Sequence, residues 1–101
     1  MGIDVIVQTE AGEELMSLGD PADLLPNLLS RLDVSSTACV RLINPYDDVV
    51  FNQAQAAVLV SELEGLRVQS SGATAEFLEG AIVLARHVAS DVHLCIMFQG
   101  D

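Results

Sequence analysis

The stretch "VHLCIMF", residues 92–98, decides how the rest of the sequence is interpreted. Alternate positions form two sides, with Val92, Leu94, Ile96 and Phe98 on one and His93, Cys95 and Met97 on the other. This alternation is the period of a β-strand. Both sides are mostly apolar, and a strand of that kind is typically central in its sheet. The sequence therefore predicts a small sheet with its C-terminal strand inside it.

Further strands are predicted in three other segments of the chain. Residues 3–18 alternate in hydropathy around an Ala-Gly pair at 11–12, which favours a β-hairpin. Residues 37–43, "TACVRLI", are rich in β-formers and predict a strand. Residues 49–51, "VVF", predict either a short strand or an extended link to the next helix.

Three amphipathic helices are predicted between these strands. The first has Asp20 as its N-cap and Pro21 in its first turn, although Pro26 should kink it or move its regular start toward residue 26. The second is capped by Asn52, with Gln55 as the partner in a capping box, and the third covers residues 74–89. Their apolar stripes are Leu24, Leu25, Leu28, Leu29 and Leu32; Ala56, Leu59, Val60, Leu63 and Leu66; and Phe77, Leu78, Ala81, Leu84, Ala85 and Val88.

The predicted order, β-β-α-β-(β)-α-α-β, indicates an α+β fold in one domain, residues 1–101. We expect a mixed or antiparallel sheet of about four to five strands, with the helices mostly on one face. The other face would carry Asp4, Gln8, Arg41 or His93 among scattered apolar groups. Because such a half-apolar face often contacts another chain, a homodimer is one hypothesis.

Charge is the most unusual feature of the composition. Fifteen acidic residues stand against four arginines and no lysine, for a net charge of −11. A nucleic-acid backbone would be repelled, whereas a basic protein partner would be attracted. Solubility of a small domain is the alternative explanation of the acidity.

Cellular context follows from the same composition. No apolar run is long enough to span a bilayer, and "MGIDV" lacks the basic start of a secretory signal, so a cytoplasmic protein is expected. Cys39 and Cys95 lie far apart within apolar runs, which favours small core residues in a reducing compartment over a disulfide.

The segment Asn44-Pro45-Tyr46-Asp47-Asp48 is the main candidate site. Pro and Asp are typical of a turn that joins two elements. The functional interpretation is that Asp47 and Asp48 bind Arg or Lys of a partner while Tyr46 adds amphipathic contact area. A third possibility is a hard-cation site that includes Asp101.

Catalytic patterns are weak in this sequence, and we expect neither a metal nor a cofactor. His87 and His93 lack other ligands at zinc spacing, and a pair of Cys95 with either histidine would place a thiolate in an apolar strand. Glu62 and Glu64, like Glu76 and Glu79, are interpreted as solvated helix surfaces.

Several of these segments together resemble a group of small, uncharacterised bacterial proteins. The similar parts are "MGIDV", the "DP" helix start, "NPYDDVVFN" at residues 44–52 and the final "FQGD". That group carries a "DPYGDTVFN" segment and ends in F-x-G-D. Asn44 stands where the pattern has Asp, and Asp47 where it has Gly.

Three functions are compatible with these observations. The first is a non-enzymatic protein-binding domain, such as an immunity or inhibitor protein, in which Tyr46, Asp47 and Asp48 contact a basic partner. The immunity role is an analogy of size and charge. The second is a self-associating structural module, and the third is a small metal-dependent or acid–base enzyme.

Overall fold

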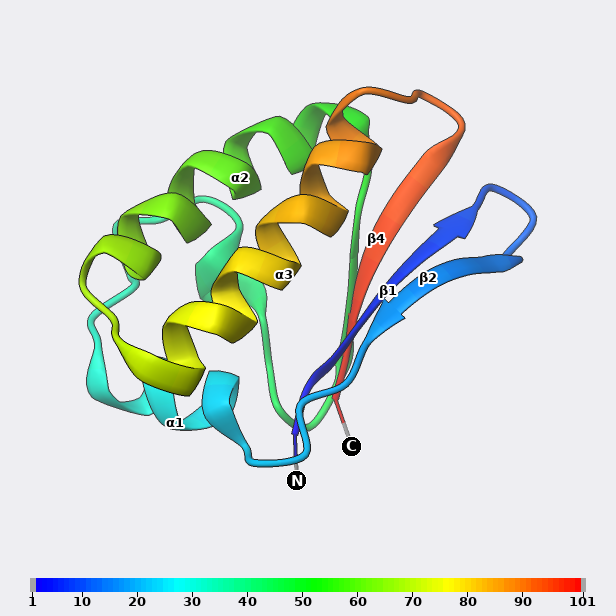
Figure 1. Ribbon diagram of the computed structural model, residues 1–101. Coiled ribbons are helices and arrows are strands. Elements are labelled where there is room, and N and C mark those ends of the chain that lie inside the picture. The colour runs from blue at the N-terminus through cyan, green and yellow to red at the C-terminus, as the bar shows by residue number, and fades with distance from the viewer. Residues whose placement is uncertain (1, 101) are drawn as a thin grey trace.

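The computed structural model describes residues 2–100, whose elements follow the order expected of an α+β domain (Figure 1). They are β1 (Asp4–Thr9), β2 (Glu14–Leu18), α1 (Leu24–Arg31), the 3-10 helix η1 (Val40–Leu42), β3 (Asp48–Phe51), α2 (Gln53–Val68), α3 (Gly72–Ala89) and β4 (Leu94–Gln99). The predicted class and order are therefore confirmed, with one strand between the first two α-helices.

The four strands form one antiparallel sheet in the order β2-β1-β4-β3. The predicted hairpin is β1 with β2, and it carries an irregularity in register between Val7 and Gln8. As its two-sided apolar pattern predicted, β4 is central, between β1 and β3. It starts at Leu94, two residues later than the sequence indicated, because Val92 and His93 lie in the turn after α3.

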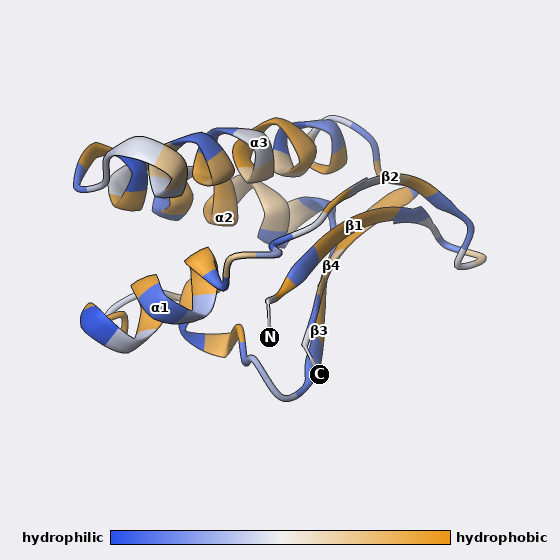
Figure 2. Ribbon diagram, turned by 60° about the horizontal axis from the view of Figure 1, so that its bottom comes forward, coloured by the Kyte–Doolittle hydropathy of each residue, from blue (hydrophilic) through white to orange (hydrophobic). Residues whose placement is uncertain are grey.

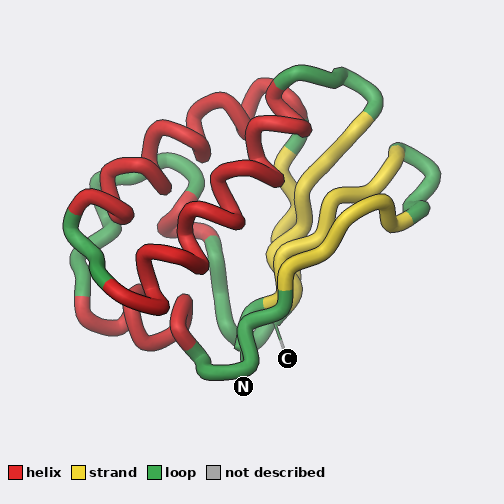
Figure 3. The backbone as a smooth tube through the Cα atoms, viewed as in Figure 1, coloured by secondary structure: helices red, strands yellow, loops and turns green. Residues whose placement is uncertain are grey.

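All three α-helices lie on one side of the sheet and leave its other side bare (Figures 1 and 3). The face toward the helices carries Val5, Val7, Phe51, Ile96 and Phe98, each at most 1% exposed. The rings of Phe51 and Phe98 meet edge to face, with centroids 5.9 Å apart. Figure 2 shows β4 as mainly apolar and β1 with apolar residues between polar ends, as expected for strands that meet this core.

Helices α2 and α3 pack side by side over the sheet, and the predicted apolar stripes face inward. Every predicted stripe residue of α3 is buried, while Val60 of α2 is only partly buried. Two exposed ion pairs, Glu64 with Arg86 and Arg67 with Glu79, join the outer rims of the helices. Exposed pairs of this kind contribute little to stability, so apolar packing holds the two helices together.

The capping box predicted for α2 is present. The Asn52 side chain accepts a hydrogen bond from the Gln55 backbone N–H at 2.9 Å, and the Gln55 side chain accepts one from the Asn52 N–H at 2.9 Å. Each bond satisfies a backbone donor that the first helical turn cannot pair.

Replacing Asn52 by alanine should lower the free energy of unfolding by about 1 kcal/mol, because the Gln55 N–H loses its acceptor. Urea denaturation followed by circular dichroism measures the change. Asn52→Asp is the control, since it keeps an acceptor oxygen and should remain close to the original protein. An unfolding midpoint for Asn52→Ala equal to that of the original chain would show that the cap is not needed.

The regular part of α1 begins after the predicted N-cap Asp20, in agreement with the shift toward residue 26 that Pro26 predicts. Residues 21–22 form a turn, and the regular helix starts at Leu24 after Asp23, whose backbone is left-handed (φ 54°). Pro26 consequently lies in the first turn, where its missing N–H breaks no helical bond. Asp20, which precedes the helix by four residues, still accepts hydrogen bonds from the unpaired N–H groups of its first turn. Its buried carboxylate accepts the N–H groups of Leu24 at 2.7 Å and Leu25 at 2.9 Å.

The strand predicted for residues 37–43 is wrong. This segment contains bends and the 3-10 helix η1 instead, and it belongs to the loop region between α1 and β3 (Figure 3). Its buried members, Cys39, Val40 and Ile43, pack against the core without a neighbouring strand. The β-forming composition reflected burial rather than pairing, because a β-branched or apolar side chain suits any packed site.

The interpretation of Glu62 as a solvated helix acid is also wrong. Its carboxylate accepts three backbone N–H groups, from Ala38 at 2.7 Å and from Cys39 and Val40 at 3.0 Å each. Burial alone would raise the pKa of Glu62, but these donors, helped by Arg41, lower it below its ordinary value. The Glu62 carboxylate thus provides the hydrogen-bond acceptors for residues 38–40 that a neighbouring strand would otherwise provide.

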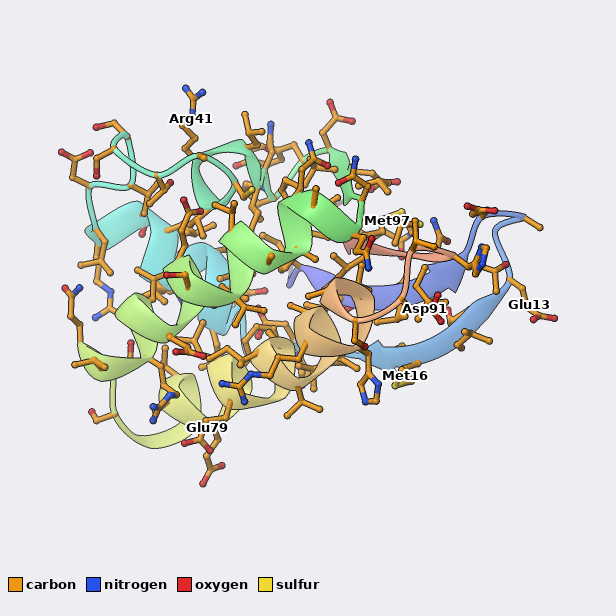
Figure 4. All side chains as sticks on the ribbon, turned by 90° about the horizontal axis from the view of Figure 1, so that it is seen from above. Glu13, Met16, Arg41, Glu79, Asp91 and Met97 are labelled. Atoms are coloured by element: carbon orange, nitrogen blue, oxygen red, sulfur yellow. The ribbon has the colours of Figure 1, made fainter. Side chains whose placement is uncertain are left out.

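The expectations for the bare sheet face are met in part. Asp4 and Gln8 alternate with the inward-facing Val5 and Val7, so both face outward. Arg41 lies in η1, outside the sheet, and its side chain points away from the molecule (Figure 4). Cys39 is a buried core residue as predicted, but Cys95 is only partly buried and faces outward beside Gln8, and both thiols are free.

Candidate functional site at one end of the sheet

The turn at residues 44–48 holds the predicted site residues in a defined shape. The Tyr46 N–H donates to the Asn44 side-chain oxygen at 2.8 Å, and the Asp47 N–H makes a longer contact of 3.4 Å with the Asn44 carbonyl. These bonds form an Asx turn, the local structure that Asn favours. They present the Tyr46 side chain to solvent with 81% of its surface exposed.

Gly100, from the other end of the chain, packs directly against this turn. Its N–H donates to the Asp47 carbonyl and to Asp48 Oδ1, each at 3.2 Å. A Cβ atom at position 100 would lie 2.6 Å from the carbonyl oxygens of Asn44 and Asp47, so only glycine fits this approach. The "NPYDD" and "FQG" segments, which are remote in sequence, are therefore parts of one structure.

A row of polar side chains crosses three strands beside the turn. Gln99 of β4 is paired with Asp4 of β1 on one side and with Asp48 of β3 on the other. Paired residues of antiparallel strands share a face, with Cβ atoms about 5 Å apart. Because Val5, Phe98 and Val49 point toward the helices, this row lies at the end of the bare face.

Each carboxylate at this end uses one oxygen for a backbone N–H and leaves the other open. Asp48 Oδ1 accepts from Gly100 at 3.2 Å, Asp47 Oδ1 accepts from Asp48 at 3.2 Å, and Asp4 Oδ1 has a longer contact of 3.4 Å with the Asp20 N–H. Within residues 2–100, none of the three forms an ion pair. Backbone contacts orient these acids, and their free oxygens face solvent.

An open hollow adjoins the row and is lined by Gly2, Asp4, Gly19, Asp20, Pro21, Gln99 and Gly100. Glycine makes much of its wall, so the hollow is bounded by backbone. Asp20 is 2% exposed and both of its oxygens accept helix N–H groups, so it does not offer its charge to a ligand. The polar side chains available to a ligand here are those of Asp4 and Gln99.

Tyr46, Asp47 and Asp48 therefore lie together at the surface, next to Asp4 and to Gln99, of which the sequence singled out only Asp4, and not as part of this site. Strand alternation already placed Asp4 on the bare face, but its alignment with Gln99 and Asp48 depends on the register of three strands. Asp101, which was considered for a cation site, lies outside the described residues.

The residues considered for catalysis are scattered. Cys95 Sγ lies 3.7 Å from the Gln8 carbonyl, and His93 lies 3.9 Å from Glu10 at the hairpin end of the sheet. Burial, with a contribution from the Glu62 charge, raises the pKa of the Cys39 thiol, which disfavours a reactive thiolate. In the described part of the chain, no group of three or more His, Cys, Asp or Glu side chains is arranged to hold a metal ion.

Comparison with protein-family models, curated protein sequences and solved structures found no match to this chain. Among residues 2–100, no helix is both long and apolar enough to cross a membrane.

Proposed function

We propose that this chain is a non-enzymatic protein-binding domain that covers a basic site on a partner protein, in the manner of an inhibitor or immunity protein. Its binding surface is the acidic end of the sheet, defined as Asp4, Tyr46, Asp47, Asp48 and Gln99. The observation that carries the proposal is the set of three oriented carboxylates that have no cation beside them among residues 2–100.

The geometry of this acidic end suits Arg or Lys of a partner. Carboxylates that are already held by backbone N–H groups lose little conformational entropy on binding. More of the free energy of each new ion pair therefore contributes to binding affinity. Tyr46 supplies a large, rigid contact that can exclude water around those pairs. The net charge of −11 would accelerate the encounter with a cationic protein at low ionic strength.

A double substitution, Asp47→Asn with Asp48→Asn, tests this proposal. It removes two charges while keeping side-chain size and one acceptor oxygen at each position. Glu13→Gln with Glu76→Gln is the matched control, because it removes two charges from exposed positions on the hairpin and on α3. Proteins captured from a source-cell lysate at low salt are released by a salt gradient and identified, and the purified partner is then titrated by calorimetry.

We expect a basic partner whose dissociation constant rises at least about tenfold with the Asp47/Asp48 variant and stays nearly unchanged with the control. Equal affinity of the original chain and the Asp47/Asp48 variant would refute the assignment of this site. Recovery of the chain alone, as a dimer that persists in high salt, would instead favour self-association.

A further inference from the structure

The bare face of the sheet continues directly from the acidic end. Its middle row runs across all four strands, from Ser17 through Ile6 and Met97 to Val50. Nothing in residues 2–100 covers this row, because the α-helices are all on the opposite side (Figures 1 and 3). Three of its four side chains are apolar, which is unusual for the solvent side of an antiparallel sheet.

These apolar side chains differ in how much of their surface is exposed to a partner. Ile6 is 8% exposed because its neighbours on the sheet surround it. Val50 is 47% exposed on the edge strand, and Met97 and Cys95 beside it are partly buried. The contact surface is therefore an apolar strip of Val50, Met97 and Cys95 over β3 and β4. Methionine suits such a surface because its flexible side chain adapts to the shape of a partner.

Acidic residues lie at both ends of the bare face. Asp48 and Asp4, on β3 and β1, lie in the row at one end, and Glu14, on β2, lies at the other end, two strands across from Cys95. None of the four arginines is in a strand; Arg67 and Arg86 are bound to glutamates on the helical side. A second copy stacked here in either direction would bring acidic ends against acidic ends, which is unfavourable. Charge complementarity selects a cationic partner instead.

We infer that the bare sheet face binds a cationic amphipathic helix of the partner protein. Apolar residues of this helix contact Val50 and Met97, and Lys or Arg residues near its two ends contact Asp4 and Asp48 on one side and Glu14 on the other. A helix is the natural cover for the open face of a sheet, since helix-on-sheet layers are a common packing solution. The inference rests on the proposed function and specifies the form of its basic partner.

The dimensions of the face set the spacing of the cations. Glu14 is paired with Gln8, four residues from Asp4 along β1 and one strand across, so Asp4 and Glu14 are separated by about 14 Å. A helix covers that distance in about nine residues, or two and a half turns. The bound helix should therefore carry basic residues about seven to nine positions apart, with apolar residues at the intervening positions of the same face.

A synthetic helical peptide of about 15 residues with this pattern is the probe, and a peptide of the same composition with its apolar residues dispersed is the comparison. Binding is followed by NMR of the full chain labelled with nitrogen-15 and by calorimetry. The test variant is Val50→Asn. Val83→Asn, on the outer side of α3, is its matched control, because Val83 is 51% exposed and Val50 is 47% exposed.

We expect the patterned peptide to perturb the amide signals of Ile6, Val50 and Met97 together with those of Asp4 and Asp48. Val50→Asn should weaken its binding about fivefold or more, whereas Val83→Asn should leave it unchanged. Thermal melts of both variants show whether each is still folded. If Val50→Asn unfolds the chain, Met97→Gln replaces it, since that change keeps side-chain length and stays within the strip.

Several results would overturn the inference: no binding of the patterned peptide, equal binding of the dispersed peptide, or no effect of either strip variant. These failures are separate from failure of the proposed function. A natural partner whose binding is lost with the Asp47/Asp48 variant but unaffected by Val50→Asn would support the acidic site and refute the role of the sheet face. A partner whose binding is insensitive to both variants would refute both proposals.

Discussion

Replacing Glu62 by alanine should lower the free energy of unfolding by about 3 kcal/mol, the largest loss we expect from a single polar side chain. Its carboxylate is the acceptor for three consecutive backbone N–H groups, at residues 38–40. Hydrogen bonds to a charged group contribute about 1.5–3 kcal/mol each, but part of this site is open to water and can be resolvated, so the three do not add fully. The segment that depends on them also carries Val40, which is fully buried.

Two companion variants make this prediction specific. Glu62→Gln keeps one acceptor oxygen without charge and should lie between the original protein and Glu62→Ala. Glu64→Ala, two residues away on the same helix, removes only an exposed ion pair with Arg86 and should change stability by less than about 1 kcal/mol. Because the chain has no tryptophan, circular dichroism during urea denaturation is the appropriate measurement. Equal losses for Glu62→Ala and Glu64→Ala would contradict the role given to Glu62.

The same carboxylate predicts a dependence of stability on pH. The pKa of Glu62 in the folded protein is lowered from its ordinary value of 4.5. Its contribution is therefore complete above that ordinary value and is lost as the pH falls through the lower, folded-state pKa. Between neutral pH and acid, the original protein should lose more stability than Glu62→Gln does. Parallel stability curves for the two proteins across this range would show that Glu62 does not carry the effect.

Replacing Asp20 by alanine should lower the free energy of unfolding by about 2–3 kcal/mol. Asp20 is the one buried acidic residue of the described chain, at 2% exposure. Its two oxygens accept the N–H groups of Leu24 and Leu25, so alanine would leave both donors without their acceptors, the one at Leu25 in a buried position. Its negative charge also lies at the positive end of the α1 dipole, an interaction that adds to the loss.

Asp20→Asn separates these two contributions. It keeps one oxygen for an N–H donor but turns the other acceptor into an amide donor, so it should recover only part of the stability. Asp23→Ala is not a suitable control, since Asp23 has its own interactions and a left-handed backbone. Asp33→Ala serves better, because it removes only two exposed, local hydrogen bonds from Ser35 and should have a small effect. An Asp20→Ala protein as stable as Asp33→Ala would show that the start of α1 does not depend on Asp20.

Local sequence signals account for most of the elements. The alternation in residues 94–98 placed β4 at the centre of the sheet, and the Asn52–Gln55 pair marked the start of α2 correctly. The apolar stripe of α3 identified its buried face. These features follow from the sequence alone because each depends on backbone periodicity or on hydrogen bonds between residues a few positions apart.

Where the sequence misled, a backbone N–H found an acceptor other than the one that its local pattern implies. Residues 37–43 have strand composition, but Glu62, more than twenty residues away, accepts the N–H groups of residues 38–40. Asp20 caps α1 from four and five residues before the groups it binds, so the helix begins later than a local N-cap implies. Composition records that a residue prefers burial, and it does not record which distant group will supply its hydrogen bonds.

For the candidate site, the sequence by itself determined that Tyr46, Asp47 and Asp48 form an exposed, acidic turn, because Pro and Asx chemistry acts within a few residues. Only the tertiary structure decided that Asp4 and Gln99 join them and that Gly100 closes against the turn. Those contacts depend on the register of three antiparallel strands. A shift of one residue would turn the same side chains to the opposite face, so the site exists only once the whole sheet has formed.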